Sequence, residues 1–126
     1  MRCWMTTPKL TIRPATAEDI AAFSDMPNKP SIRAMAGELD GRIVGLGGLV
    51  FHQGRWLGFV DLLPEARPHK IAIARAAIRF LEEARRDGIK FIYVEADLNE
   101  PTALRWLTSL GFHLDPRSNF LYRWRA

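Results

Sequence analysis

Apolar and polar positions follow two rhythms along this chain, and the changes of rhythm predict its elements. Short alternating or continuous apolar runs between turn residues predict strands, whereas recurrence at i, i+3, i+4 and i+7 predicts helices. The predicted strands are Lys9–Arg13, Ile32–Leu39, Arg42–Phe51, Arg55–Leu63, Phe91–Ala96, Phe112–Leu114 and Asn119–Trp124. The predicted helices run from Thr16 to Phe23 or Met26, from about Lys70 to a stop at Gly88, and from Pro101 in the first turn through Leu110.

The turns between these elements predict how the strands are connected. Asp40-Gly41 and Gln53-Gly54 join the second, third and fourth strands as antiparallel hairpins. Glycines 45, 47 and 48 inside the third strand indicate a bulge or a close backbone approach. The order β-α-β-β-β-α-β-α-β-β predicts one α/β (α+β) domain over residues 1–126, with a mixed, mostly antiparallel sheet and helices on both faces. The fourth and fifth strands should be parallel neighbours, because a helix joins them.

The junction between the fourth strand and the second helix is the first candidate for chemistry. Pro64 and Pro68 keep the segment between them out of helix. A basic turn then opens the clearest helix of the chain. The start of a helix attracts anions, since its dipole and its unpaired N–H groups act at one point. We therefore expect an anionic group to bind here.

Composition narrows the class of protein only slightly. The formal charge of +4 and the pI near 9.7 favour an anionic partner. Cys3 is the single cysteine, so no internal disulfide can form, and a reducing compartment is expected. The first residues show no signal-peptide pattern, and no apolar run is long enough to span a membrane. A cytoplasmic protein without a metal site is the expectation, because the histidines and the cysteine lack ligand-like spacing.

Three segments in this order resemble the GNAT superfamily of N-acetyltransferases. LTIRPATAEDI resembles the opening strand and helix of that family, and NEPTALRWLTSLGF resembles its late helix and GF strand. LLPEARPHKIA falls where the acyl-CoA loop, R/Q-x-x-G-x-G/A, is found. The small size and the arginine-rich PEAR segment also resemble acetyltransferase-like proteins encoded by phages and prophages. The resemblance covers almost the whole chain and implies the GNAT fold.

The resemblance implies acetyl-CoA as the co-substrate. Arg67 takes the first position of the loop motif, Lys70 replaces its first glycine and Ala72 takes its last position. A lysine can still offer its backbone N–H to the pyrophosphate, provided that it needs no positive φ. The implied cofactor-binding residues are Leu62, Leu63, Arg67, Pro68, His69, Lys70, Ile71, Ala72, Asn99 and Ala103. The pantetheine arm is expected to pair beside Leu62 and Leu63 like an extra strand.

Catalytic residues are harder to assign. The position that often carries a tyrosine acid in the family is Leu107 here, which cannot donate a proton. Asp61 and Glu95 lie on the two strands that flank the expected cleft, so they are the candidate general bases. A solvated or salt-bridged carboxylate is the plainer interpretation of each.

Three functions remain open at this point. The chain is an acetyl-CoA-dependent N-acetyltransferase acting on an amine, or a silent relative that binds CoA or a protein partner. Its interleaved arginines and aromatics near the C-terminus also fit a nucleic-acid-binding surface, but no recognition motif accompanies them. Alternation within a strand explains the same pattern. The last strand is further expected to leave an apolar edge through which two copies form a homodimer.

Overall fold

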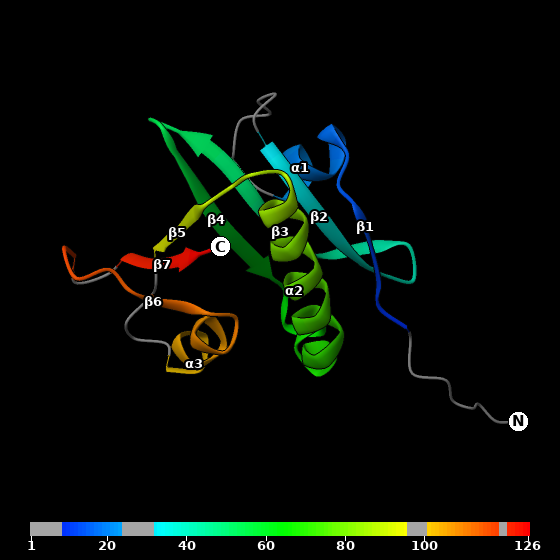
Figure 1. Ribbon diagram of the computed structural model, residues 1–126. Helices are drawn as coiled ribbons and strands as arrows, with labels where there is room; N and C mark the ends of the chain where they lie inside the picture. Colours follow the sequence, from blue (N-terminus) through cyan, green and yellow to red (C-terminus); the bar gives the residue numbers. More distant parts are fainter. Residues whose placement is uncertain (1–8, 24–31, 96–100, 119–120) are drawn as a thin grey trace, which may run out of the picture.

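The strands form a single seven-stranded sheet in this computed structural model, which describes residues 9–23, 32–95, 101–118 and 121–126. Its order is β1-β2-β3-β4-β5-β7-β6 (Figure 1). The strands are β1 Thr11–Pro14, β2 Ile32–Leu39, β3 Arg42–His52, β4 Arg55–Leu62, β5 Phe91–Glu95, β6 Phe112–Leu114 and β7 Leu121–Arg125. The helices are α1 Ala17–Phe23, η1 Pro64–His69, α2 Lys70–Arg86 and α3 Pro101–Ser109.

Strand directions confirm the predicted mixed sheet. All neighbouring strands are antiparallel except β4 and β5, which are parallel and joined through η1 and α2. The two hairpin turns have glycines with positive φ, Gly41 and Gly54, as their sequences predict. The α/β fold class is therefore confirmed.

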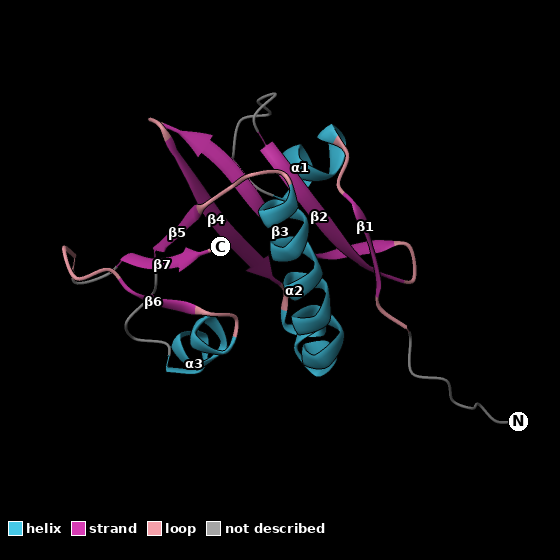
Figure 2. Cartoon of the chain, viewed as in Figure 1, coloured by secondary structure: helices cyan, strands magenta, loops and turns pink. Residues whose placement is uncertain are grey.

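Helices cover both faces of the sheet (Figure 2). On one face, Leu81 of α2 and Leu107 of α3 pack in the same cluster as Ile92 of β5. On the other face, Ile20 of α1 packs with Ala36 of β2 and Leu46 of β3. We call these faces the α2 side and the α1 side.

A β-bulge lets β3 supply core residues to both faces. Gly37 pairs with Gly45 and Glu38 pairs with Ile43, so Val44 is the extra residue. Val44 consequently packs toward α2, while Leu46 packs toward α1. Gly48 is a place of close approach, because a Cβ there would lie 2.0 Å from the carbonyl oxygen of Arg33. The glycine-rich sequence of this strand is thus explained by both expected causes.

A reciprocal capping box fixes the start of α1. The N–H of Asp19 donates to Thr16 Oγ1 (3.1 Å), and the N–H of Thr16 donates to Asp19 Oδ2 (2.9 Å). The guanidinium of Arg13 also donates to Asp19, at 2.7 Å. The Arg13 hydrogen bond, followed by that from Thr16, lowers the pKa of Asp19 from 3.8 to about 2.

Two expectations from the sequence are wrong. The segment Pro64–His69 is a 3₁₀ helix that leads directly into α2. Pro64 lies in its first turn, where proline is compatible with a helix, and Pro68 lies within it. β7 is not an edge, because it pairs with β5 on one side and β6 on the other. Its edge cannot serve as the expected dimer contact.

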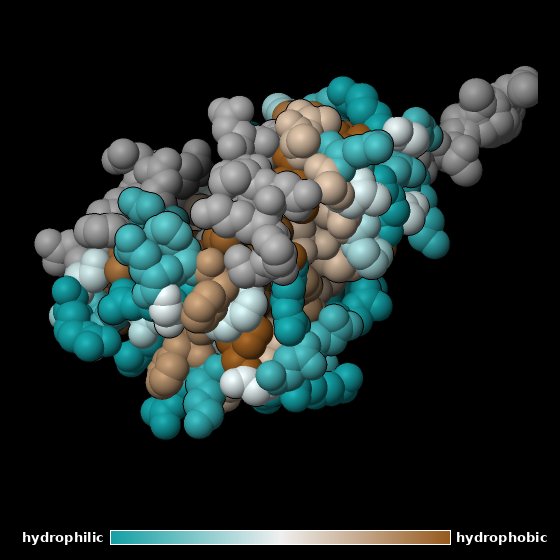
Figure 3. Space-filling view, turned by 90° about the horizontal axis from the view of Figure 1, so that it is seen from above, coloured by the Kyte–Doolittle hydropathy of each residue, from teal (hydrophilic) through white to brown (hydrophobic). Residues whose placement is uncertain are grey.

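Apolar side chains remain at the surface in several places. Figure 3, seen from above, shows hydrophilic residues around a central strip of apolar surface. The exposed large apolar side chains are Phe51, Val60, Leu62, Ile71, Ile78, Phe91 and Leu114. None of the described helices has both the length and the hydropathy that crossing a membrane requires.

Candidate active site

Strands β4 and β5 separate soon after they meet. Their register contains one pair in the described chain, Leu57 with Tyr93, although β4 continues to Leu62 and β5 to Glu95. In Figure 1 the two arrows point away from each other. The sheet is therefore splayed between β4 and β5, and we call the Leu57–Tyr93 pair its vertex.

The splay leaves one edge of β4 open. The N–H of Leu63 donates to Val44 O of β3 at 2.8 Å. Backbone groups of consecutive residues in an extended chain point to opposite edges, so those of Val60 and Leu62 point into the gap. Their side chains are also 46% and 43% exposed. Among the described residues, the gap thus presents backbone donors and acceptors without a strand partner, beside exposed apolar surface, and an extended ligand can cover this combination.

The lack of a side chain at Gly58 lets β4 and β5 approach each other beside the vertex. A Cβ on Gly58 would lie 2.8 Å from Val94 Cγ2 and 3.4 Å from Ile92 Cγ2. A larger residue would therefore require the Val94 side chain of β5 to shift beside the described pair of β4 with β5. Gly58 is therefore a positioning residue that the sequence pattern did not identify.

The basic turn lies at the far end of β4, where η1 leads into α2. Lys70 has φ −55° and ψ −39°, which is ordinary helical backbone. The lysine in place of the motif glycine is therefore free of strain. Arg67 and Lys70 are exposed and His69 is half-buried, and the His69 side chain does not cap α2. The turn presents positive side chains at the start of a helix, as predicted.

An ion pair ties this turn to the β2–β3 hairpin. The Arg42 guanidinium donates to the carboxylate of Glu65 in η1. The pKa of Glu65 is lowered first by its own backbone N–H and then by Arg42. Glu65 is thus neutralised by its partner, which leaves the charges of Arg67 and Lys70 for an external anion.

The remaining loop residues divide between the surface and the core. Ile71 is 71% exposed, whereas Ala72 packs against the cluster of Leu10, Val44 and Ala66. Leu63 joins the same cluster, so its side chain faces inward, whereas its neighbour Leu62 is 43% exposed and lies over Gly45 of β3. Ala103 is half-buried in α3, Pro68 is exposed, and Asn99 lies outside the described residues.

Both candidate carboxylates lie on the α1 side of the splay. Asp61 is the register partner of Leu46, which packs toward α1. Phe59 packs against the α1-side cluster, so Leu57, two residues earlier in β4, lies on the same side. Tyr93 is the register partner of Leu57, and Glu95 follows it by two residues in β5. Register partners and residues two apart in a strand share a face. Asp61 and Glu95 are exposed and stand on opposite arms of the gap.

Glu95 lies nearer the vertex than Asp61 does. At about 3.3 Å per residue, Glu95 is about 7 Å along β5 from Tyr93, and Asp61 is about 13 Å along β4 from Leu57. Tyr93 is 8% exposed and lies at the vertex itself. No described group makes a hydrogen bond with its hydroxyl.

Leu107, the position of the family tyrosine, lies in the core. It is 6% exposed and packs in the cluster of Leu81, Ile92 and Trp124. Leucine is suited to this environment because it leaves no polar atom buried. A proton donor, if the site has one, must come from another residue.

Comparison with solved structures identifies the fold. The Escherichia coli ribosomal-protein-S18-alanine N-acetyltransferase has a TM-score of 0.70 and 13% identity, over 93% of this chain and 94% of that one. An Agrobacterium tumefaciens acetyltransferase has a TM-score of 0.70 and 16% identity, over 100% and 99%. A GNAT family acetyltransferase from Elizabethkingia anophelis with acetyl-CoA bound has a TM-score of 0.66 and 12% identity, over 93% and 98%.

At the level of sequence the picture is different. No protein-family model and no curated protein matches the chain. The likeness therefore rests on the arrangement of strands and helices, and this chain has the fold of the GNAT acetyltransferases.

Proposed function

We propose that the chain is a GNAT-type N-acetyltransferase that uses acetyl-CoA to acetylate an amine. The observation that carries this proposal is the open edge of β4 at Val60 and Leu62, between the vertex and the basic turn. Acetyl-CoA has an anionic end and an amide-containing arm that match these two features. The solved structure from Elizabethkingia anophelis with the same fold has acetyl-CoA bound.

The chain's own residues would hold the cofactor along β4. Arg67, His69 and Lys70 would bind its phosphates at the start of α2. The backbone of Val60 and Leu62 would pair with the pantetheine amides, and their side chains would lose exposed apolar surface. The arm would then run back from the turn toward the vertex.

Bound acetyl-CoA supplies an activated acetyl group, and this chain's residues must provide for its transfer. Glu95 is placed to accept a proton from the amine, because it is the carboxylate nearer the vertex. Asp61 would attract the protonated amine from the opposite arm. Tyr93 is the candidate donor of a proton to the departing thiolate, since its hydroxyl has no described partner and the family position is occupied by Leu107.

Calorimetry with acetyl-CoA tests this proposal directly. We expect saturable binding by the wild-type protein, and weaker binding by a variant with Val60 and Leu62 changed to proline, which has no N–H to pair with the arm. A control with Phe51, exposed at the far end of the sheet, changed to Ser should bind as the wild type does. Absence of binding by folded wild-type protein would exclude the proposal.

A silent CoA-binding protein is the second candidate. It is favoured by the burial of Leu107, which removes the usual proton donor. Release of CoA during incubation with a panel of amines separates the two functions, because a silent protein binds acetyl-CoA without consuming it. Loss of that release in Glu95→Gln and Tyr93→Phe, with binding retained, would support the enzyme.

A further inference from the structure

One half of the sheet carries a charged face that the site described above does not explain. Strands β5, β7 and β6 pack Ile92, Trp124 and Phe112 toward the α2 side. Their α1-side residues belong to none of the three apolar clusters of the described chain. That face is defined here as the basic face: Arg55, Phe91, Tyr93, His113, Arg123 and Arg125.

Aromatic rings hold two of these arginines in place. The guanidinium of Arg55 lies 4.8 Å from the ring centroid of Tyr93, and that of Arg123 lies 5.4 Å from the ring centroid of Phe91. A cation–π contact orients the guanidinium but leaves its N–H donors available. Such arginines are pre-organised for a carboxylate or a phosphate.

No cation of the basic face forms an ion pair in the described chain. The ion pairs there join Arg13, Arg33, Arg42 and Arg117 to acidic groups. Two acidic residues lie nearby, Glu95 and Asp115. Asp115 is buried and accepts from the backbone N–H of Arg117 at 3.1 Å; that hydrogen bond and, to a smaller degree, the charges of Arg117 and Arg123 lower its pKa. Asp115 therefore balances part of the charge of Arg123, and the rest of the positive charge on the basic face is available to an external anion.

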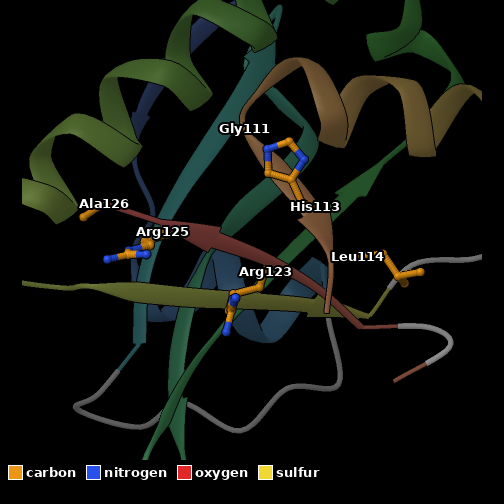
Figure 4. Close-up of a pocket in the computed structure, with 6 residues that line it drawn as sticks. All are labelled: Gly111, His113, Leu114, Arg123, Arg125 and Ala126. Carbon is orange, nitrogen blue, oxygen red and sulfur yellow. The ribbon is translucent and has the colours of Figure 1, made fainter. Parts of the chain in front are cut away.

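The basic face also contains a hollow. It has a volume of about 340 Å³ and is lined by Gly111, His113, Leu114, Arg123, Arg125 and Ala126. Figure 4 shows these six residues, with Arg123 and Arg125 on β7 and His113 on the neighbouring β6. The size suits a small polar group of a ligand.

The strand register places this hollow beside the vertex. Leu57, Tyr93, Arg123 and His113 form one row across β4, β5, β7 and β6. At about 4.8 Å between strands, Arg123 is about 5 Å and His113 about 10 Å from Tyr93. Glu95, the candidate base, lies on the same face two residues beyond Tyr93.

We propose that this hollow is an anion subsite for the acceptor, and that the acceptor carries a carboxylate or phosphate in addition to its reactive amine. The amine would lie at Glu95 and the vertex, while Arg123, Arg125 and His113 hold the anionic group. This inference rests on the proposed acetyl transfer, whose cofactor lies along β4 toward α2. It names the class of acceptor that the same site accepts.

An NMR titration of isotope-labelled protein in the presence of CoA tests the subsite residue by residue. The probes are phosphoethanolamine and 4-aminobutyrate, which carry an amine with a phosphate or a carboxylate, and n-butylamine, which carries the amine alone. We expect both anionic probes to shift the signals of residues 113, 123 and 125 and to bind at least about tenfold more tightly than n-butylamine. The relative affinity of the two anionic probes distinguishes phosphate from carboxylate.

Matched variants locate the effect. Arg123→Gln with Arg125→Gln should weaken the anionic probes by about tenfold or more and leave n-butylamine unchanged. Arg75→Gln removes an exposed positive charge on α2, away from the hollow, and should change neither the affinity for the anionic probes nor that for n-butylamine. Equal affinity for all three probes, or retained affinity in the double variant, would overturn the subsite. Tighter binding of a single-stranded oligonucleotide at the same signals would replace the acceptor with nucleic acid.

Acetyl-CoA binding is measured on the same samples, so that the two proposals fail separately. If the double variant loses the anionic probes but binds acetyl-CoA as the wild type does, both proposals stand. If the wild type binds no acetyl-CoA, the transferase proposal falls, and the acceptor inference falls with it even where the probes bind. If acetyl-CoA binds and the anionic probes leave the β6 and β7 signals unmoved, only the subsite is excluded.

Discussion

The two arms of the splayed sheet are built in different ways. In the arm β1–β4, side chains pack on both faces: Val44 lies toward α2 and Leu46 toward α1. In the arm β5-β7-β6, one face packs against α2 and α3 through Ile92 and Trp124. The opposite face carries arginines held over aromatic rings.

This difference suggests separate roles for the two arms: the β1–β4 arm contributes packing on both faces, whereas the other arm leaves one face for charged groups. In an arm that is filled on both faces the residues are constrained by packing, so a ligand can bind only along its open edge at β4. An arm filled on one face keeps the other for charged groups. The two arms meet at Gly58 and Val94, so the proposed reaction would take place where a rigid half adjoins an open one.

The largest effect on stability should come from a substitution of Gly48 in β3, in the β1–β4 arm. We expect Gly48→Ala to destabilise the protein by more than about 4 kcal/mol or to prevent folding, because the new Cβ meets the backbone of β2. Gly47→Ala is the matched control, since its nearest contact is 3.4 Å, and should change the free energy of unfolding by less than about 1 kcal/mol. Urea denaturation measures both. Similar midpoints for the two variants would contradict the register of β2 and β3.

A smaller effect should separate a buried leucine of the β1–β4 arm from an exposed leucine of the β5-β7-β6 arm. Leu46→Ala should cost about 2–5 kcal/mol, since the side chain is 1% exposed. Leu114→Ala, at 48% exposed in β6, should cost less than about 1 kcal/mol. Thermal and urea unfolding give the two values. An equal loss would mean that the Leu114 side chain is packed as tightly as that of Leu46.

Charge reversal at the basic turn should remove cofactor binding. Acetyl-CoA at a hundredfold excess over its dissociation constant should stabilise the wild type by about 2.7 kcal/mol. Arg67→Glu with Lys70→Glu should abolish that gain, because the turn would then repel phosphate. Arg75→Glu with Arg79→Glu, further along α2, changes the net charge equally and should retain it. A gain preserved in the first pair would locate the phosphates elsewhere.

A tyrosine at position 107 should harm the fold without restoring an acid. Leu107→Tyr should destabilise the protein by about 1–3 kcal/mol, because the larger ring enters a filled core. Leu107→Met keeps the volume and should cost less than about 1.5 kcal/mol. Denaturation curves measure the two costs. Faster acetyl transfer in Leu107→Tyr would show instead that the position faces the thioester.

The smallest effect should be the pH dependence at α1. The folded pKa of Asp19 is about 2, below its ordinary value of 3.8. A lowered folded pKa gives stability that is present above about 3.8 and is lost as the pH falls toward about 2. Asp19→Asn should therefore flatten this part of the stability profile, as measured by melting temperature against pH. A profile unchanged by the substitution would mean that Asp19 has the same pKa in the folded and unfolded chains.

Local pattern accounts for most of the elements. The hairpins at Asp40-Gly41 and Gln53-Gly54, the capped start of α1 and the parallel pairing of β4 with β5 follow from it and are confirmed. It failed at Pro64–His69, where a 3₁₀ helix is compatible with two prolines, and at the position of β7. Whether a strand lies at the edge of the sheet depends on pairing with other strands of the chain. The alternation of apolar and polar residues within a strand does not predict those partners.

The candidate site shows the same division. The sequence determined the basic turn and its lysine, and it placed Asp61 and Glu95 on the two strands that border the gap. Only the tertiary structure decided that β4 and β5 part after one pair, that Leu107 is core, and that Arg123 and His113 share a row with Tyr93. The physical reason is that these features arise from packing between residues far apart in the chain, such as Gly58 against Val94. A side chain's own neighbours in sequence cannot specify such contacts.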